Sequence, residues 1–173
     1  MSSASRKPAA IPLKDPGPTP VERVAVEDAI AACRELPGAL LPLLHAVQDR
    51  LGYVPPQAVP MIAHGLNLSR ADVHGVISFY HHFRAAPPGR HVVQLCRAES
   101  CQAMGSAALE ASAKHHLRID YGQTSASGAV TLEPAYCLGN CALSPAILLD
   151  GELLGRVTPV RLTQLLDALE AQA

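Results

Sequence analysis

Four of the five cysteines stand as two close pairs in the second half of the chain. Cys96 and Cys101 are separated by four residues, and Cys137 and Cys141 follow some thirty-five residues later with three residues between them. Thiolates are soft ligands that suit zinc or an iron–sulfur cluster, and two such pairs can enclose one metal centre. A shared site therefore requires a fold that brings two distant loops together. The spacing fits a zinc site and an iron–sulfur cluster equally well.

The spacing argues against other kinds of cysteine site. A dithiol redox centre needs two cysteines two residues apart, and the sequence has no C-x-x-C motif. A plant-type ferredoxin needs a third cysteine two residues after a C-x4-C pair, and none is there. The sequence also lacks a dinucleotide fingerprint, a P-loop, a serine nucleophile elbow and an H-E-x-x-H motif. We therefore expect no independent catalytic site in this chain.

Composition limits the kind of protein further. The 173 residues suffice for one domain with a helical appendage, and 49% apolar residues with only 3% aromatics predict an aliphatic core. A net charge of −1 gives no electrostatic case for nucleic acid. No apolar run approaches the ~18–20 residues of a membrane-spanning helix, so we expect no membrane insertion. An odd number of cysteines without an export signal indicates a reducing, cytoplasmic compartment.

The first half of the chain predicts a tail followed by a helical bundle. Residues 1–21 are rich in proline and serine without a helical apolar stripe, so we expect a disordered tail. Residues 22–83 carry helical apolar patterns with short connections, which are typical of antiparallel helices in a small bundle. The expected helices are residues 26–36, 42–51, 56–65 and 70–80. Pro42 lies in the first turn of the second helix and Gly52 ends it, and Ser69 and Asp72 form a capping box before the fourth.

The second half predicts an α/β domain. Residues 84–90 contain two prolines and a glycine and read as a linker, and residues 91–173 alternate strand and helix patterns. Asp150-Gly151 is the strongest hairpin signal in the chain. The expected elements are a strand at 91–96, a helix at 104–117, strand candidates at 118–121 and 129–133, a hairpin of 146–149 and 152–157, and a last helix capped by Thr158-Pro159.

Each cysteine pair is predicted to lie where a loop leaves a regular element. Cys96 ends the first strand, and Cys101 comes just before the helix 104–117. The N-terminus of that helix presents free N–H groups and a partial positive charge, which suit an anionic site. Gly139 and Asn140 tolerate a left-handed backbone, which can wrap closely around a metal centre and donate N–H bonds to its sulfurs.

The motifs LCRAESCQAMGS and AYCLGNCALSPAI resemble the thioredoxin-like [2Fe–2S] family. This family is the small iron–sulfur subunit beside the flavin subunit of respiratory complex I, of soluble NAD-dependent formate dehydrogenases and of NAD-linked hydrogenases. The stretch LLPLLHAVQDRLGYVPPQAVPMIAHGLNLSRADVHGVISFYHHF is similar to the family's helical region, so the resemblance covers about residues 36–169. It implies a thioredoxin-like domain after a helical bundle, with one [2Fe–2S] cluster on Cys96, Cys101, Cys137 and Cys141.

The resemblance also implies a role and partners. The chain would transfer single electrons as a non-catalytic subunit, beside a subunit that carries flavin mononucleotide, NAD and further clusters, together with a further catalytic subunit. The runs YCLGNCALSPA and DGELLGRVTP look closer to the gamma subunit of a soluble NAD-dependent formate dehydrogenase than to complex I. The equivalent subunit of complex I or of a hydrogenase is the alternative, and a structural zinc-binding adaptor and a diffusible ferredoxin are the rivals.

Other conspicuous residues are expected to be structural. Cys33 lies on a helix outside the cluster domain and is predicted to be a small core residue. Adjacent histidines point to different sides of an element, so they do not make bidentate metal sites. The remaining expectations are packing or surface roles for His81, His82, His115 and His116. Phe79, Tyr80 and Phe83 are expected in the core, with an anchor for a partner as the alternative.

Overall fold

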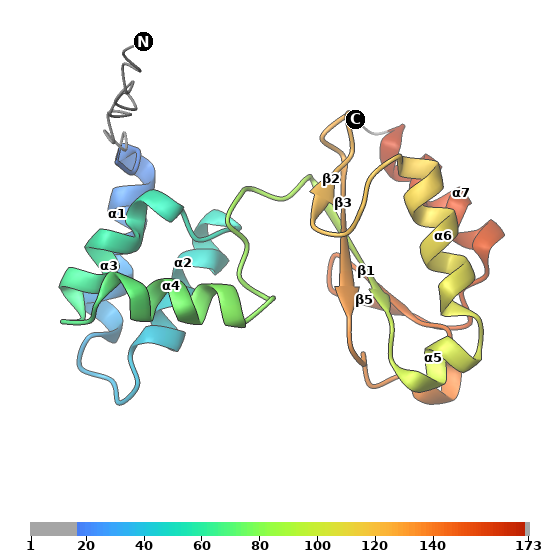
Figure 1. Cartoon of the computed structure of the whole chain (residues 1–173). Helices are drawn as coiled ribbons and strands as arrows, with labels where there is room; N and C mark the ends of the chain where they lie inside the picture. The colour runs from blue at the N-terminus through green and yellow to red at the C-terminus, as the bar shows by residue number, and fades with distance from the viewer. Residues whose placement is uncertain (1–16, 172–173) are drawn as a thin grey trace, which may run out of the picture. The chain divides into compact units, whose positions relative to one another are not determined.

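The computed structural model describes residues 17–171, and these form two compact units divided between Ala86 and Pro87. The division falls inside the predicted linker 84–90. The first unit is helical, and the second combines helices with a sheet (Figure 1). Most of the predicted tail, residues 1–16, lies outside the described residues. Among those that are described, no helix is both long and apolar enough to cross a membrane.

The first helix begins earlier than the sequence pattern predicts. α1 spans Pro20–Cys33, so its first turn occupies the end of the predicted tail. The Thr19 hydroxyl accepts from the backbone N–H of Glu22, and the Glu22 carboxylate accepts from the Thr19 N–H at 2.6 Å. This capping box satisfies backbone N–H groups that a helix N-terminus leaves without partners. The capping box precedes the apolar stripe of α1. A prediction from apolar periodicity alone therefore places the start of this helix too late.

The other helices of the first unit follow their predicted signals. Gly52 ends α2 with a left-handed φ of 82°, and Ser69 and Asp72 form the predicted capping box. The elements after α1 are α2 (Leu40–Leu51), the short 3-10 helix η1 (Pro56–Ala58), α3 (Val59–Gly65) and α4 (Arg70–Phe79).

The first unit has an aliphatic core with one buried amide. Leu43 and Leu44 are fully buried, and Cys33 is buried beside the same cluster as predicted. The side chain of Gln48 donates from Nε2 to the carbonyl of His82 at 2.8 Å and accepts from the N–H of Arg84 at 2.8 Å. The amide therefore fastens the chain that leaves α4 to α2, with both of its polar ends satisfied.

The prediction for the aromatic residues is correct at one position only. Phe83 is buried in the core, whereas Phe79 is 73% exposed and Tyr80 is 42% exposed. The helix α4 ends at Phe79, and the backbone becomes extended at Tyr80 before Phe83 enters the core. The core expectation for Phe79 and Tyr80 is wrong.

The second unit is a five-stranded sheet in the order β2-β3-β1-β4-β5. Strands β1 and β3 are parallel, and the outer pairings are antiparallel. The elements in chain order are β1 (His91–Cys96), α5 (Glu99–Ala103), α6 (Ser106–Leu117), β2 (Gln123–Thr124), β3 (Val130–Ala135), the 3-10 helix η2 (Cys141–Leu143), β4 (Ile147–Leu149), β5 (Glu152–Leu154) and α7 (Pro159–Glu170).

Helices α6 and α7 lie side by side on one face of this sheet (Figure 1). Their apolar residues Leu109 and Leu162 share a core with Leu95, Leu132 and Ile147, all at most 1% exposed. The core is aliphatic, as the composition predicts. In β1 the buried Val93 and Leu95 flank the half-buried Gln94, whereas Val130, Thr131 and Leu132 of β3 are all buried.

Three elements differ from the sequence prediction, one of them β5, which ends at Leu154 rather than at residue 157. Residues 118–121 form a turn rather than a strand, and the edge strand β2 begins only at Gln123. Arg118 adopts a left-handed φ of 55° at the end of α6, which is incompatible with a regular strand. The short helix α5 is absent from the prediction, because its five residues are too few to show a period.

Candidate metal centre

The parallel pairing of β1 and β3 explains why the two cysteine loops meet. The carboxyl ends of parallel strands lie at the same edge of a sheet. Cys96, the last residue of β1, pairs with Ala135, two residues before Cys137. The backbone N–H of Arg97 donates to the Ala135 carbonyl at 2.7 Å, and that of Cys96 donates to the Ala146 carbonyl at 3.1 Å. The two loops therefore leave one sheet edge together.

The first cysteine pair is buried. Cys96 and Cys101 are 3% and 2% exposed and pack with Ala146 in a small cluster of their own. Cys101 lies inside the helix α5, not just before α6 as the sequence predicts. Its position is thus fixed by the hydrogen bonds of α5, and the longer helix α6 begins only at Ser106.

The second cysteine pair is exposed; Cys137 lies on an irregular loop, and Cys141 begins the 3-10 helix η2. The sulfurs of Cys137 and Cys141 are 4.0 Å apart, and the backbone N–H of Gly139 donates to Cys137 Sγ at 3.4 Å. The left-handed residues are Cys137, with φ 106°, and Gly139, with φ 76°. Asn140 has φ −106°, so the expectation of a left-handed backbone is confirmed at Gly139 and wrong at Asn140.

The distance within this pair suits a shared metal ion. At a metal–sulfur distance of about 2.3 Å, two ligands of one tetrahedral ion lie about 3.8 Å apart, close to the separation of Cys137 and Cys141. Within residues 17–171, no three His, Cys, Asp or Glu side chains close on a single point. The thiols are arranged as two pairs, and a binuclear cluster requires one pair for each of its two irons.

The segment that connects β5 to α7 packs against the second cysteine loop. The backbone N–H of Arg156 donates to the Leu143 carbonyl at 2.6 Å. A Cβ on Gly155 would lie 2.6 Å from the Cβ of Leu143 and 2.9 Å from Nδ2 of Asn140. Only glycine permits this close approach, so Gly155 is required for the loop to rest on the connection between β5 and α7.

The electrostatics of the first pair reflect its burial and its hydrogen bonds. Burial acts to raise the pKa of Cys96, but the backbone N–H of Ala98 and the thiol of Cys101 oppose it. The backbone N–H groups of Leu138 and Cys137 act in the same direction. Together these donors hold the pKa of Cys96 below the ordinary thiol value. Donors from both loops therefore favour a thiolate at this position.

Cys141 of the second pair behaves in the opposite way. The pKa of Cys141 is raised, first by its hydrogen bond with Cys137 and then by the negative charge of that neighbour. Burial and the charges of Cys101 and Cys96 add to the effect. Cys141 thus senses the other three cysteines, which is the repulsion that a cation relieves.

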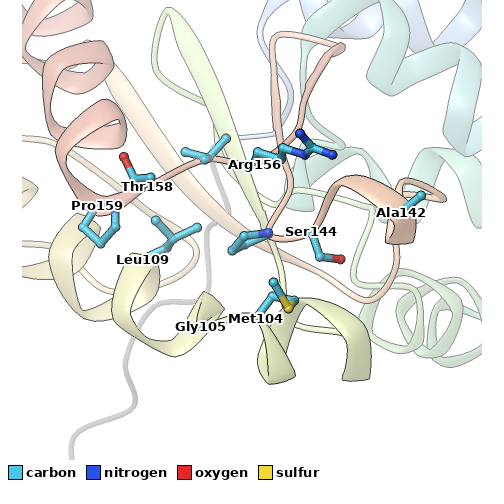
Figure 2. A pocket seen from close by; sticks show the side chains of 10 residues that line it. Met104, Gly105, Leu109, Ala142, Ser144, Arg156, Thr158 and Pro159 are labelled. Carbon is cyan, nitrogen blue, oxygen red and sulfur yellow. The ribbon is translucent and has the colours of Figure 1, made fainter.

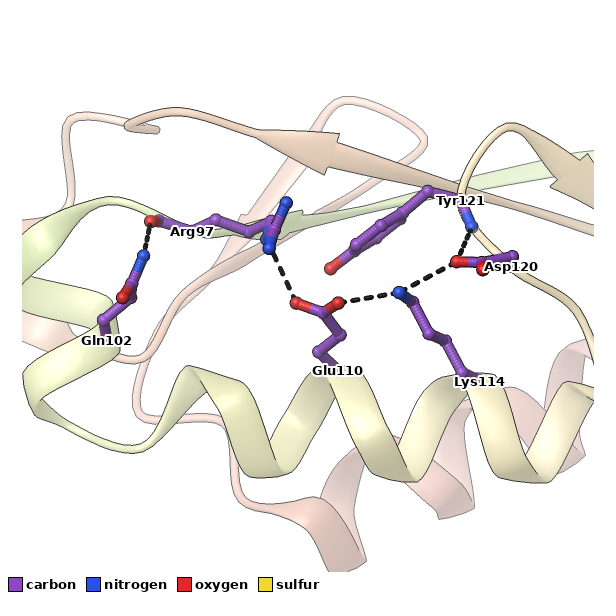
Figure 3. A network of polar contacts seen from close by, with 6 residues as sticks. All are labelled: Arg97, Gln102, Glu110, Lys114, Asp120 and Tyr121. Carbon is purple, nitrogen blue, oxygen red and sulfur yellow. Dashed lines mark hydrogen bonds and ion pairs between the residues drawn. The ribbon is translucent and has the colours of Figure 1, made fainter.

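A polar network continues from the first cysteine along the sheet (Figure 3). Arg97 pairs with Glu110 at 3.0 Å, and Lys114 bridges Glu110 at 2.7 Å and Asp120 at 2.8 Å. The Lys114 ammonium lies 4.2 Å from the centre of the Tyr121 ring. Burial raises the pKa of Tyr121, and the negative charge of Glu110 adds to it. This network ties the residue after Cys96 to α6.

Sequence reasoning finds the four cysteines but misses the residues that support them. Ser144, in the second loop, contacts Cys101 of the first loop, and Gly155 contacts the second loop from another segment. Neither residue type indicates a metal site in the sequence. Their proximity depends on tertiary pairing. The histidines expected to be structural lie elsewhere: the rings of His45 and His82 pack at 5.1 Å, and His116 pairs with Asp167 at 2.9 Å.

The fold and these loops place the chain in a known family. Residues 26–170 match the family described as thioredoxin-like [2Fe–2S] ferredoxin, and the chain belongs to it. The family carries one [2Fe–2S] cluster, and the α/β unit is thioredoxin-like as predicted.

Components of two kinds of oxidoreductase complex are among its relatives. The chain is 35% identical over 147 residues to a NADH-quinone oxidoreductase subunit of Pseudomonas aeruginosa, covering 85% of this chain and 89% of that protein. It is 30% identical over 149 residues to an NADP-reducing hydrogenase subunit of Solidesulfovibrio fructosivorans, covering 86% of each.

A solved hydrogenase contains a similar structure. The chain matches an NAD+-reducing [NiFe]-hydrogenase in the H2-reduced state with a TM-score of 0.64 and 26% identity. The match covers 78% of this chain but only 22% of the hydrogenase chain, so this chain spans about a fifth of that protein.

Proposed function

We propose that Cys96, Cys101, Cys137 and Cys141 hold one [2Fe–2S] cluster, with one iron on each pair. The observation that carries this proposal is the meeting of two thiol pairs at one sheet edge, in a chain that belongs to a [2Fe–2S] family. Once bound, the cluster supplies a site that accepts and releases a single electron.

The two cysteine pairs have different roles around the cluster. The buried first pair keeps one side of the cluster away from water, and the exposed second pair forms the side through which an electron enters and leaves. The Gly139 N–H, which donates to Cys137 Sγ, stabilises negative charge on that sulfur. Four thiolates make the centre anionic, so partial burial lowers its reduction potential.

We infer that the chain serves as an electron-transfer subunit of an NAD-linked oxidoreductase complex. The relatives named as a NADH-quinone oxidoreductase subunit and an NADP-reducing hydrogenase subunit support this inference, since they are similar along most of the chain. A partner subunit would carry flavin mononucleotide and NAD, and a further subunit would carry the catalytic site. The free thiols fit a cytoplasmic location.

Exposed apolar side chains beside the cysteines offer the partner a contact surface. Met104, Tyr136 and Leu143 are 62%, 66% and 41% exposed, and each lies within three residues of a cysteine. Apolar and aromatic residues concentrate at the centres of protein interfaces. We assign this rim to the subunit that exchanges electrons with the cluster, because a donor has to approach the exposed pair.

The gamma subunit of an NAD-dependent formate dehydrogenase is the second candidate. The observation in its favour is the run YCLGNCALSPA, followed by DGELLGRVTP. The relatives favour an NADH-quinone oxidoreductase or hydrogenase complex instead, and the ligand cysteines do not separate these complexes. Purification of the tagged chain with its partners decides between them: a formate-oxidising subunit would support the second candidate, and quinone-linked subunits would exclude it.

Metal analysis tests the cluster itself. Anaerobically purified protein is expected to contain two irons and two acid-labile sulfides per chain, with zinc below stoichiometric amounts. Stoichiometric zinc without sulfide would make the cysteines structural and would remove the electron-transfer role.

A further inference from the structure

One buried hydroxyl touches both cysteine loops. Ser144 is 8% exposed, and its Oγ lies 3.4 Å from the sulfur of Cys101. The same oxygen lies 2.9 Å from the carbonyl oxygen of Cys141 and 2.9 Å from Oγ of Ser100. The Ser100 hydroxyl also donates to the Cys141 carbonyl at 3.2 Å. Two serines and two cysteines from both loops thus form one small network.

The protons of this network can be counted. A serine hydroxyl has one proton to donate and can accept from others. A metal-bound Cys101 is a thiolate, which has no proton, so its contact with Ser144 is a hydrogen bond only if Ser144 donates. A charged sulfur is a stronger acceptor than the neutral Cys141 carbonyl. The Ser100 proton then serves that carbonyl, so the Cys101 sulfur and the Cys141 carbonyl each have one donor.

We propose that Ser144 is a tuning residue, whose hydroxyl donates to the Cys101 thiolate and thereby raises the reduction potential of the cluster. The inference rests on the proposed function, since it requires a cluster on Cys101. Reduction adds one negative charge, and a donor at a ligand sulfur stabilises the reduced state more than the oxidised state. Ser100 acts indirectly, because its proton frees that of Ser144 for the sulfur.

The hydroxyl remains accessible to exchange with solvent. Ser144 lines an open hollow of about 440 Å³, together with Met104, Leu109 and Arg156 (Figure 2). The proton of Ser144 can therefore be replaced by deuterium without unfolding the protein. This makes the proposed hydrogen bond visible to spectroscopy.

A redox titration of the cluster-loaded chain tests the proposal. Ser144→Ala removes the donor and is expected to lower the ratio of reduced to oxidised cluster at a fixed potential by roughly threefold to tenfold, where tenfold equals about 59 mV for one electron. Ser100→Ala is expected to shift the potential in the same direction by less. Ser125→Ala is the matched control, because Ser125 is a buried serine whose hydroxyl bonds Ser127, away from the cysteines. It should leave the potential unchanged.

A deuterium measurement gives a second, independent readout. After exchange into D2O, the reduced wild-type cluster is expected to show a hyperfine coupling from one deuteron near Cys101 Sγ, and resonance Raman bands of its Fe–S bonds are expected to shift. The deuteron coupling should disappear in Ser144→Ala and persist in Ser144→Thr, which keeps a hydroxyl. The Raman shift should become smaller in Ser144→Ala, where the N–H groups bonded to Cys96 and Cys137 still exchange. If Ser144→Ala fails to load a cluster, the wild-type deuterium result decides alone.

The outcomes separate this inference from the proposed function. A cluster-loaded Ser144→Ala protein with the wild-type potential, or with a higher one, would overturn the role of Ser144 while the cluster assignment stands. A wild-type cluster without the deuteron coupling would do the same. A wild-type chain that binds no iron and sulfide would remove both proposals together.

Discussion

The two cysteine loops reach the same sheet edge by different physical means. Cys96 and Cys101 are buried and lie on a regular strand and a short helix, so backbone hydrogen bonds within these elements fix them. Cys137 and Cys141 are exposed and lie on an irregular loop and the short 3-10 helix η2, which rest on the segment around Gly155. The comparison teaches that the first pair is a rigid half of the site, whereas the second pair depends on contacts with a distant part of the chain.

The largest expected difference between the loops concerns ligand replacement. Cys96→Ser is expected to lose most of the iron–sulfur cluster. The serine would bury a hydroxyl among apolar side chains, and water cannot reach this buried position to replace the lost ligand. Cys137→Ser is expected to keep a cluster with an altered spectrum, since solvent reaches this ligand. Iron and sulfide content measures both variants. Equal retention, or greater loss in Cys137→Ser, would break the distinction between a rigid and an adaptable half.

The second-largest expected effect is a loss of protection from hydrogen exchange in the second loop when the cluster is removed. In the chelated protein, hydrogen exchange is expected to rise most in residues 137–145, where a few long-range contacts hold an irregular backbone. Exchange in residues 96–103 is expected to rise less, and residues 43–51 of α2 serve as the control that stays unchanged. Faster exchange in the first loop than in the second would reverse the comparison.

A smaller effect is expected at the support of the second loop. Gly155→Ala places a Cβ 2.6 Å from that of Leu143, and overpacking of this kind costs about 1–3 kcal/mol of unfolding free energy. Gly75→Ala in α4 is the control, because nothing lies within 4 Å of its Cβ and alanine favours a helix. Chemical denaturation measures both. A Gly155→Ala protein as stable as wild type would show that the loop does not depend on this contact.

The sequence alone predicts the first loop better than the second. The strand 91–96 is found at its full length because its β-branched pattern is local, and Gly52 and Ser69 mark helix ends by their own chemistry. The left-handed φ of Cys137 and the support from Gly155 come from tertiary packing, which a pattern along the chain does not contain. The capping box of Thr19 and Glu22 is local, but it precedes the apolar stripe that the prediction follows.

The smallest expected effect concerns the ion network that adjoins the first loop. Burial acts to raise the pKa of Glu110, but its hydrogen bond to Lys114 and the charges of Lys114 and Arg97 lower it below the ordinary value of 4.5. A lowered carboxyl pKa contributes stability that is fully present above the unfolded pKa and is lost as pH falls through the folded one. Glu110→Gln should therefore cost about 1 kcal/mol or less at neutral pH.

The pH dependence provides the check. The stability difference between wild type and Glu110→Gln is expected to stay constant at pH values above about 5.5 and to shrink on acidification below 4.5. Thermal unfolding across this range measures it, with exposed Glu152→Gln as the control. A difference that grows toward acidic pH would contradict the assigned sign.

Electron paramagnetic resonance tests the central claim most directly. The claim is that two thiol pairs hold one [2Fe–2S] cluster that transfers single electrons. Anaerobic protein is expected to be silent when oxidised, because the two ferric irons couple to zero spin, and to give an S = 1/2 signal from one unpaired electron per chain after dithionite. A protein that stays silent after reduction and contains stoichiometric zinc would contradict the account.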